Sequence, residues 1–214
     1  LDPINDRETV PLAQALGRVL AQDLISPIDV PAHDNSAMDG YAFAHGFSAS
    51  GPARLRIGGA ALAGRPYPTR VPAGACVRIM TGTVLPNGCD TVVPQELCTV
   101  HDDTLWFPAD AVRAAEHCRP RGEDLARGAA ALQAGRHLTP ADLGLAASLG
   151  VESLLVMRRL RVAYFSTGDE VCAPGTPLRP GAIYDANGAS VRAMLERLGV
   201  TPIDLGIVGD DPAR

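Results

Sequence analysis

The spacing of apolar residues changes character twice along this chain. After an extended entry at residues 8–11, apolar side chains recur at helical spacing over residues 12–20, which predicts an amphipathic helix that ends by Leu24. From about residue 40 to residue 123 the apolar runs are short and separated by glycine and proline, a pattern typical of strands joined by turns. The strands predicted in this stretch cover residues 55–57, 76–79, 91–93 and 105–107.

A second helical pattern begins near residue 139. Thr139 is suited to the N-cap and Pro140 to the first helical position. Because a lone short helix rarely survives without a packing partner, we expect residues 1–34 and 125–158 to form one discontinuous helical domain. Residues 35–124 are then a β-rich domain inserted into it.

The last stretch has the pattern of a strand, a helix and a second strand. Residues 160–165 and 202–207 are predicted strands, and residues 191–198 place apolar side chains on one face of a helix that Gly199 ends. This order predicts parallel strands with a right-handed crossover, and therefore an α/β domain over residues 159–214. Both strands end at the same edge of such a sheet, where ligands bind in open α/β folds.

Composition and charge exclude several function classes. The net charge of the 214 residues is −5 and all 19 basic residues are arginine, so no lysine cluster is available for nucleic acid. No apolar run approaches the roughly 20 residues that cross a bilayer, so we expect a cytoplasmic protein without a membrane partner. The five cysteines are odd in number and widely spaced, which predicts reduced thiols and no zinc site.

Three loops combine glycine with hydroxyl or acidic side chains, at residues 35–41, 78–82 and 166–170. Glycine lets the backbone approach a ligand, a hydroxyl donates to oxyanion oxygens, and a carboxylate holds a hard cation. Read singly, Asp39 is also explained as a turn residue and Thr81 as an ordinary strand end. The three loops together indicate oxyanion and metal chemistry.

Acidic residues gather at the predicted carboxyl edge of the parallel strands. Asp169 and Glu170 follow the first strand, and Asp210 and Asp211 follow the second. Like charges repel unless a cation relieves them, and magnesium, with one or two protein carboxylates and substrate phosphates, suits this pattern. The alternative is that Asp211 is only a helix cap and Asp169 only a turn residue.

Two further segments have a structural explanation beside a functional one. Asp185 and Asn187 precede the crossover helix, where they could cap the helix or help to bind an anion. Residues 119–124 form a mixed-charge run in which arginine could clamp an oxyanion, although such runs are usually solvated surface. No G-x-S-x-G motif or metal-like histidine spacing occurs, so covalent catalysis is not expected.

Six motifs follow one another at residues 31–41, 72–82, 90–96, 121–124, 165–170 and 183–187. In this combination the chain resembles the molybdopterin molybdenumtransferases, which include bacterial molybdenum-insertion enzymes and the C-terminal domain of gephyrin. The resemblance implies a homodimer that inserts molybdate into adenylylated molybdopterin with Mg²⁺ and releases AMP. It also implies an upstream molybdopterin adenylyltransferase as partner and identifies the parallel-sheet domain as the pterin-binding one.

Matching positions carry the family's functional residues onto this chain. The resemblance implies catalytic roles for Asp39, Thr81, Glu170 and Asp210, of which Glu170 and Asp210 would also hold the metal. Donors near Thr81 would hold molybdate, in a cleft that two subunits share. Substrate-binding roles are implied for Ser36, Gly82, Asp124, Thr167, Gly168, Asp185 and Asn187.

Family members continue past the position of Arg214, so we expect this chain to be a truncated part that is inactive alone. Two other functions stay open. A non-catalytic pterin-binding or scaffold module would bind pterin without releasing AMP. The strand–helix–strand unit alone resembles domains of nucleotide amidohydrolases, but the loops at residues 35–41 and 78–82 argue against that interpretation.

Overall fold

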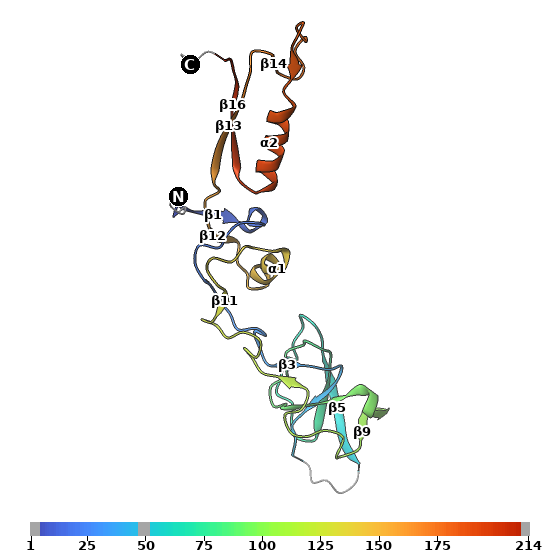
Figure 1. The fold of residues 1–214 in the computed structure, drawn as a ribbon. Helices are drawn as coiled ribbons and strands as arrows, with labels where there is room; N and C mark the ends of the chain where they lie inside the picture. Colours follow the sequence, from blue (N-terminus) through green and yellow to red (C-terminus); the bar gives the residue numbers. More distant parts are fainter. Residues whose placement is uncertain (1–4, 47–51, 211–214) are drawn as a thin grey trace. The chain divides into compact units, whose positions relative to one another are not determined.

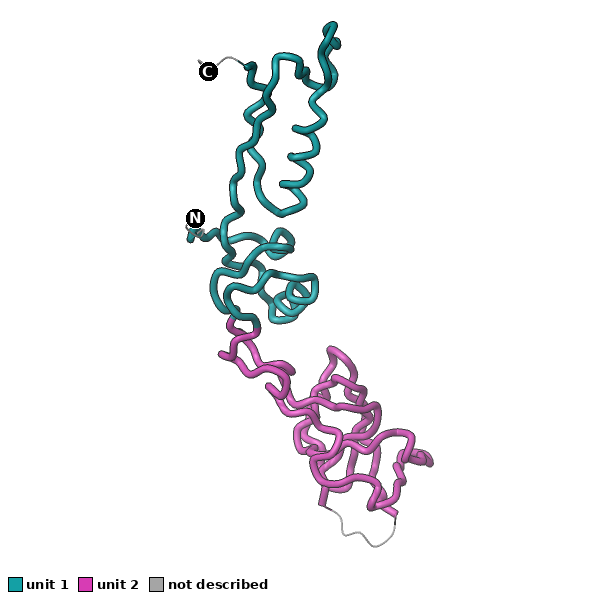
Figure 2. Tube along the Cα trace, in the orientation of Figure 1, with its two compact units in different colours: residues 1–24, 132–214 teal, residues 25–131 magenta. Residues whose placement is uncertain are grey.

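The computed structural model describes residues 5–46 and 52–210 of the chain, which folds into two compact units (Figures 1 and 2). The terminal unit combines Leu1–Leu24 with Leu132–Arg214, and the inserted unit is Ile25–Ala131. Strands and a few helices build both units, as expected of a mixed α/β protein. The finer division into three domains, with boundaries near residues 35, 125 and 159, stays a prediction.

A six-stranded sheet organises the inserted unit, with the strand order β7-β4-β6-β5-β9-β8. Neighbouring strands are antiparallel except for β5 and β6, which are parallel. All four strands predicted in this stretch are confirmed. The strands are β4 (Gly40–Phe43), β5 (Ala53–Ala61), β6 (Ala75–Ile79), β7 (Thr91–Pro94), β8 (Thr99–His101) and β9 (Thr104–Phe107).

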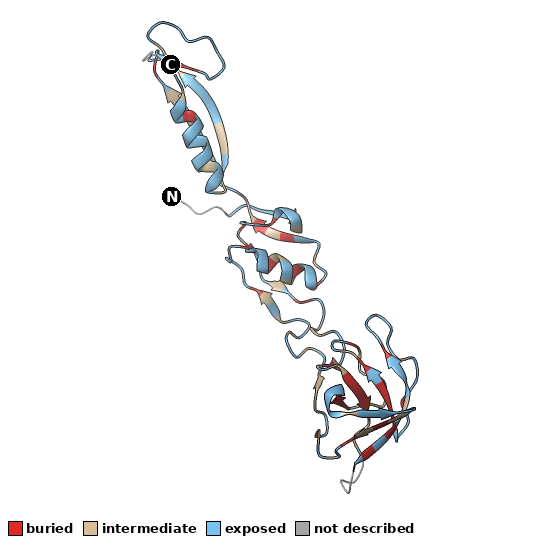
Figure 3. Ribbon diagram, turned by 90° about the vertical axis from the view of Figure 1, so that its right-hand side faces the viewer, coloured by how far each residue is buried: buried red, intermediate tan, exposed pale blue. Residues whose placement is uncertain are grey.

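Both faces of this sheet are buried near its centre. Successive side chains of a strand point to opposite faces, and in β4 Tyr41 and Phe43 join one apolar cluster while Ala42 joins the other. Figure 3 shows the resulting concentration of buried residues in the strands of this unit. Short elements complete it, namely β3 (Asn35–Ser36), the 3-10 helix η2 (Gln95–Leu97) and β10 (Cys118–Arg119).

The prediction of an amphipathic helix over residues 12–20 is wrong. Only the 3-10 helix η1 (Leu12–Gln14) forms, and Gly17 then takes a φ of 70°, a left-handed conformation that ends helical geometry. Leu20 is buried, but it bridges Val156 as an extended residue. The buried residues of this turn and the extended segment after it therefore have the same spacing as the apolar face of a helix.

Strands rather than helices consequently dominate the part of the terminal unit that was expected to be a helical domain. β1 (Arg7–Pro11) pairs antiparallel with β12 (Ser153–Met157). The boundary between the two units falls within β2 (Leu24–Ile25) and β11 (Ala130–Leu132).

The second predicted helix is confirmed as α1 (Pro140–Ser148). Thr139 is its N-cap, and Asp142 completes a capping box by accepting the Thr139 backbone N–H at 2.9 Å. Asp142 is buried and also accepts from Arg136 Nε at 2.9 Å. The Arg136 guanidinium, followed by the Thr139 donors, lowers the pKa of the Asp142 carboxyl to about 2.

The strand–helix–strand prediction is also confirmed. β13 (Arg161–Thr167) and β16 (Thr201–Val208) are parallel, and α2 (Ala186–Arg197) connects them, with the short pair β14 (Val171–Cys172) and β15 (Ile183–Tyr184) in between. Much of this part is exposed in Figure 3. Within the described residues, no helix is long and apolar enough to span a bilayer.

All five cysteines are free thiols. Burial raises the pKa of Cys76 and of Cys89 to about 12 in each case. Such thiols stay protonated at neutral pH, which makes them poor nucleophiles.

Candidate functional site

Asp39 and Thr81 form a hydrogen-bonded pair in the inserted unit. Asp39 immediately precedes β4 and Thr81 closely follows β6, and the antiparallel pairing of these strands aligns Gly40 with Ile79. Thr81 donates both its backbone N–H and its Oγ1 hydroxyl to Asp39 Oδ1, each at 2.7 Å. The backbone donor, followed by the hydroxyl, holds the pKa of the Asp39 carboxyl below its ordinary value.

Close main-chain packing fixes the backbone beside this pair. A Cβ on Gly40 would lie 2.0 Å from the carbonyl oxygen of Val93, so β4 and β7 approach closely only because residue 40 is glycine. The Asp39 carbonyl also accepts the backbone N–H of Gln95 at 3.0 Å. The main chain at Asp39 and Gly40 is therefore fixed by its contacts with Val93 and Gln95.

The remaining N–H groups of the Thr81 loop also donate to the protein. Gly82, with a φ of 77°, donates its N–H to the Ser36 carbonyl at 2.8 Å, and Thr83 donates to Met80 at 3.0 Å. The Ser36 hydroxyl donates to the Met38 carbonyl at 2.6 Å. The structure thus brings Ser36, Asp39, Thr81 and Gly82 together, while the hydroxyl and N–H donors of Ser36, Thr81 and Gly82 are engaged within the unit.

Asp124 belongs to an ion-pair network beside β3. Arg119 donates to Glu123 Oε2 and to Asp124 Oδ1, each at 2.6 Å, and the two carboxylates raise the pKa of Arg119. Arg119 lies opposite Asn35 in the β3–β10 pair. Its guanidinium is committed to these exposed carboxylates, as expected of a solvated charge run.

The acidic loops of the terminal unit meet at the carboxyl ends of β13 and β16, as the parallel order predicted. Gly168 donates its N–H to the Val208 carbonyl at 3.1 Å, and Asp210 donates its backbone N–H to Asp169 Oδ1 at 3.2 Å. Asp169 thus joins the two loops, in agreement with a structural role for its side chain. Asp211 lies outside the described residues.

Glu170 lies close to its own turn. A Cβ on Gly168, where φ is 136°, would meet Glu170 Oε2 at 2.7 Å, so the carboxylate lies over this glycine. Among the described residues, no three Asp, Glu, His or Cys side chains converge as they would around a metal ion. Glu170 and Asp210 nevertheless offer exposed hard oxygen donors on adjoining loops, which suits Mg²⁺ because it often takes only one or two protein carboxylates.

Asp185 caps α2 and has both carboxylate oxygens engaged. Gly188 donates its N–H to Oδ1 at 2.8 Å, and Ser166 donates its hydroxyl to Oδ2 at 2.7 Å. The Gly188 N–H, followed by the Ser166 hydroxyl, lowers the pKa of Asp185. The capping explanation of Asp185 is therefore confirmed, and Ser166, which was not predicted as a site residue, connects the cap to β13.

Of the predicted residues, Thr167 is the last residue of β13 and Asn187 is the second residue of α2. Asp185 and Gly188 line a hollow of about 360 Å³ together with Tyr164, Arg192 and Asp204. Sequence reasoning did not single out these last three residues, because a tyrosine and an aspartate inside predicted strands have no motif that distinguishes them from ordinary strand residues.

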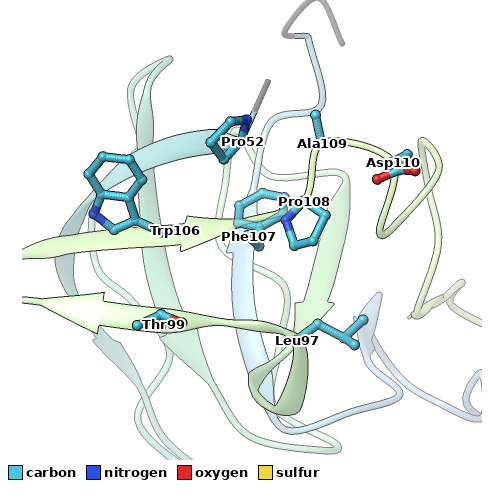
Figure 4. A pocket seen from close by; sticks show the side chains of 8 residues that line it. All are labelled: Pro52, Leu97, Thr99, Trp106, Phe107, Pro108, Ala109 and Asp110. Atoms are coloured by element: carbon cyan, nitrogen blue, oxygen red, sulfur yellow. The ribbon is translucent and has the colours of Figure 1, made fainter. Parts of the chain in front are cut away.

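A larger hollow of about 570 Å³ lies in the inserted unit beside β8 and β9 (Figure 4). Its lining is mostly apolar and consists of Pro52, Leu97, Thr99, Trp106, Phe107, Pro108, Ala109 and Asp110. The guanidinium of Arg54 lies 3.7 Å from the centre of the Trp106 ring, a cation–π contact. None of the predicted site residues lines this hollow.

The fold defines a class of protein in which a β-rich unit is inserted before a parallel α/β element, with carboxylate-bearing loops on both parts. Residues 1–150 match the family described as MoeA N-terminal region (domain I and II), and residues 163–214 match the probable molybdopterin binding domain. The chain belongs to the MoeA family of molybdopterin molybdenumtransferases.

Curated relatives and solved structures agree with this assignment. The chain is 40% identical to molybdopterin molybdenumtransferase of Haemophilus influenzae, over 97% of this chain and 51% of that protein. It is also 40% identical to molybdopterin molybdenumtransferase 2 of Mycobacterium tuberculosis, over 96% and 52%. The crystal structure of the molybdopterin biosynthesis moeA protein from Pyrococcus horikoshii OT3 is similar with a TM-score of 0.87 at 29% identity, over all of this chain and 57% of that one. The chain spans about half the length of the curated relatives it matches.

Proposed function

We propose that the complete protein inserts molybdate into adenylylated molybdopterin and releases AMP during molybdenum cofactor biosynthesis. Membership of the MoeA family supports this role. The observation that carries it to particular residues is the Asp39–Thr81 pair, in which two 2.7 Å hydrogen bonds hold a half-buried carboxylate in one orientation. Such fixed geometry is what a positioned reaction requires.

In this proposal the terminal unit supplies the metal ligands and part of the substrate site. Glu170 and Asp210 would hold Mg²⁺, which neutralises phosphate charge when bound. Thr167 and Gly168 would contact the substrate at the end of β13, while Asp185 fixes the beginning of α2. The other residues proposed to bind substrate are Ser36, Gly82, Asp124 and Asn187.

The setting of the reaction is part of the same proposal. The complete protein would act as a cytoplasmic homodimer and receive its substrate from a molybdopterin adenylyltransferase. Each subunit would then supply part of a shared cleft.

Replacing Glu170 by Gln in the complete protein tests the proposal. The substitution keeps the shape of the side chain but removes a charged oxygen ligand, so release of AMP from adenylylated molybdopterin should fall on the order of 100-fold. Glu152→Gln is the matched control, because Glu152 is also exposed in the terminal unit and should leave turnover unchanged. Undiminished turnover in Glu170→Gln would contradict the metal role. Pterin binding without any AMP release by the unmodified protein would instead favour a non-catalytic binding module.

A further inference from the structure

The donors of Thr81 and the backbone N–H groups that follow it point toward protein acceptors, whereas the buried hydroxyl of Thr83 has no hydrogen-bond partner among the described residues. Both donors of Thr81 end on Asp39 Oδ1, and the N–H groups of Gly82 and Thr83 end on carbonyl oxygens. Among the described residues, Asp39 Oδ2 has no hydrogen-bond partner. Of the side-chain atoms of this pair, the one left without a partner is therefore an acceptor.

We propose that Thr81 is a positioning residue that acts through Asp39. It holds Oδ1 so that Oδ2 faces the ligand as an ionised acceptor, and it does not itself hold molybdate. The inference rests on the proposed function and gives Thr81 a narrower role within it.

The geometry of the pair supports a positioning role for Thr81. The Asp39 side chain has two rotatable bonds, and its backbone is already fixed by the Gln95 N–H and by the close approach of Gly40 to Val93. Two donors on one carboxylate oxygen then fix the remaining torsions. Loss of the Thr81 hydroxyl would remove one of these bonds and leave the backbone N–H of Thr81 as the one donor to Oδ1, which fixes the orientation of the carboxylate less firmly.

The charge of Asp39 also supports a positioning role for Thr81. The ionised Asp39 carboxylate repels a dianion such as molybdate at short range, whereas the nearby Arg78 guanidinium, which also lowers the Asp39 pKa, attracts one. The same carboxylate accepts strongly from a hydrogen-bond donor. Asp39 Oδ2 is therefore suited to a donor group of the substrate complex, and the oxyanion must be held by other groups.

A mutant cycle in the complete protein separates positioning from direct binding. Thr81→Val removes the hydroxyl and keeps the backbone donor, so kcat/KM should fall about 10- to 100-fold, as expected for a misplaced group. The KM for molybdate should not change, and Thr81→Ser should restore activity. In an Asp39→Ala background, Thr81→Val should cause no further loss, because residues that act as one unit are not additive. A rise in the molybdate KM, or losses that multiply in the double variant, would overturn the proposal.

Titration of the Asp39 carboxyl by ¹³C NMR in this 214-residue chain needs no turnover, and so remains informative if the proposed reaction is wrong. Thr81→Val should raise the pKa of Asp39 toward its ordinary value, and Thr81→Ser should not. The acid limb of kcat/KM in the complete protein should move to higher pH in the same variant. Asp29 is an internal control for folding of the same unit, because the Arg127 backbone N–H, followed by the Arg121 guanidinium, lowers its pKa. An unchanged Asp39 titration in a folded Thr81→Val chain would reject the role of Thr81.

Discussion

The two units support their acidic loops by different means. Beside Asp39 in the inserted unit, the close neighbour of Gly40 is a backbone carbonyl, which cannot move without disturbing β7. Beside Glu170 in the terminal unit, the close neighbour of Gly168 is the end of the Glu170 side chain itself. A flexible carboxylate can rotate away at little cost, whereas a strand cannot. The comparison indicates that main-chain packing holds the backbone beside Asp39, whereas the Glu170 side chain is free to move away from its turn.

Gly40→Ala should have the largest effect on the free energy of unfolding, because it tests the main-chain packing beside Asp39. The new Cβ would lie 2.0 Å from the Val93 carbonyl oxygen, so we expect a loss of more than about 4 kcal/mol in the free energy of unfolding, or failure to fold. Denaturant unfolding of the chain measures this loss. Gly46→Ala is the control in the same unit, because nothing lies within 4 Å of its added Cβ. Equal stabilities of the two variants would show that the sheet tolerates separation of β4 from β7.

Two leucines compare the packing of the units themselves. Leu105 of β9 is 0% exposed, so Leu105→Ala should cost about 3 kcal/mol through lost contacts and a cavity. Leu205 of β16 is 59% exposed, so Leu205→Ala should cost less than about 1 kcal/mol. Unfolding monitored by fluorescence of Trp106, which lies next to Leu105 in β9, reports on the inserted unit, and circular dichroism follows both. A large loss in Leu205→Ala would mean that its side chain is covered in solution.

Part of the regular structure was predictable from local sequence, because strands between glycine and proline turns and a helix with a Thr-Pro start leave clear local patterns, but β4, β8 and β12 were not among the predicted strands. The segment around Leu12–Gln14 was not, since its apolar spacing fits a helix while its long-range pairing with β12 is invisible in local sequence. The same limit applies to the site. The parallel order of β13 and β16 predicted adjoining acidic loops, but the donation of both Thr81 donors to one oxygen depends on the register of β4 and β6.

Acid should destabilise the terminal unit through Asp142. Its folded pKa is lowered to about 2 from a reference value of 3.8, so its contribution is present above pH 3.8 and is lost as the pH falls through 2. Asp142→Asn cannot ionise and should therefore lose stability at pH 6 and show a weaker decline between pH 4 and pH 2. Denaturant midpoints across this range measure the slope. A decline as steep as that of the unmodified chain would assign the acid sensitivity to other carboxylates.

Gly144→Ala should have the smallest effect on the free energy of unfolding, and it contrasts a glycine that packing does not require with Gly40. Gly144 is exposed within α1 and an added Cβ meets nothing within 4 Å, so no contact requires glycine there. Alanine restricts the unfolded chain and favours the helix, and the free energy of unfolding should rise by up to about 1 kcal/mol. Denaturant midpoints of the two chains, compared at equal slope, measure the gain. If Gly144→Ala is instead destabilising, a contact outside the described residues must require glycine at this position, because the described residues provide no neighbour that would clash.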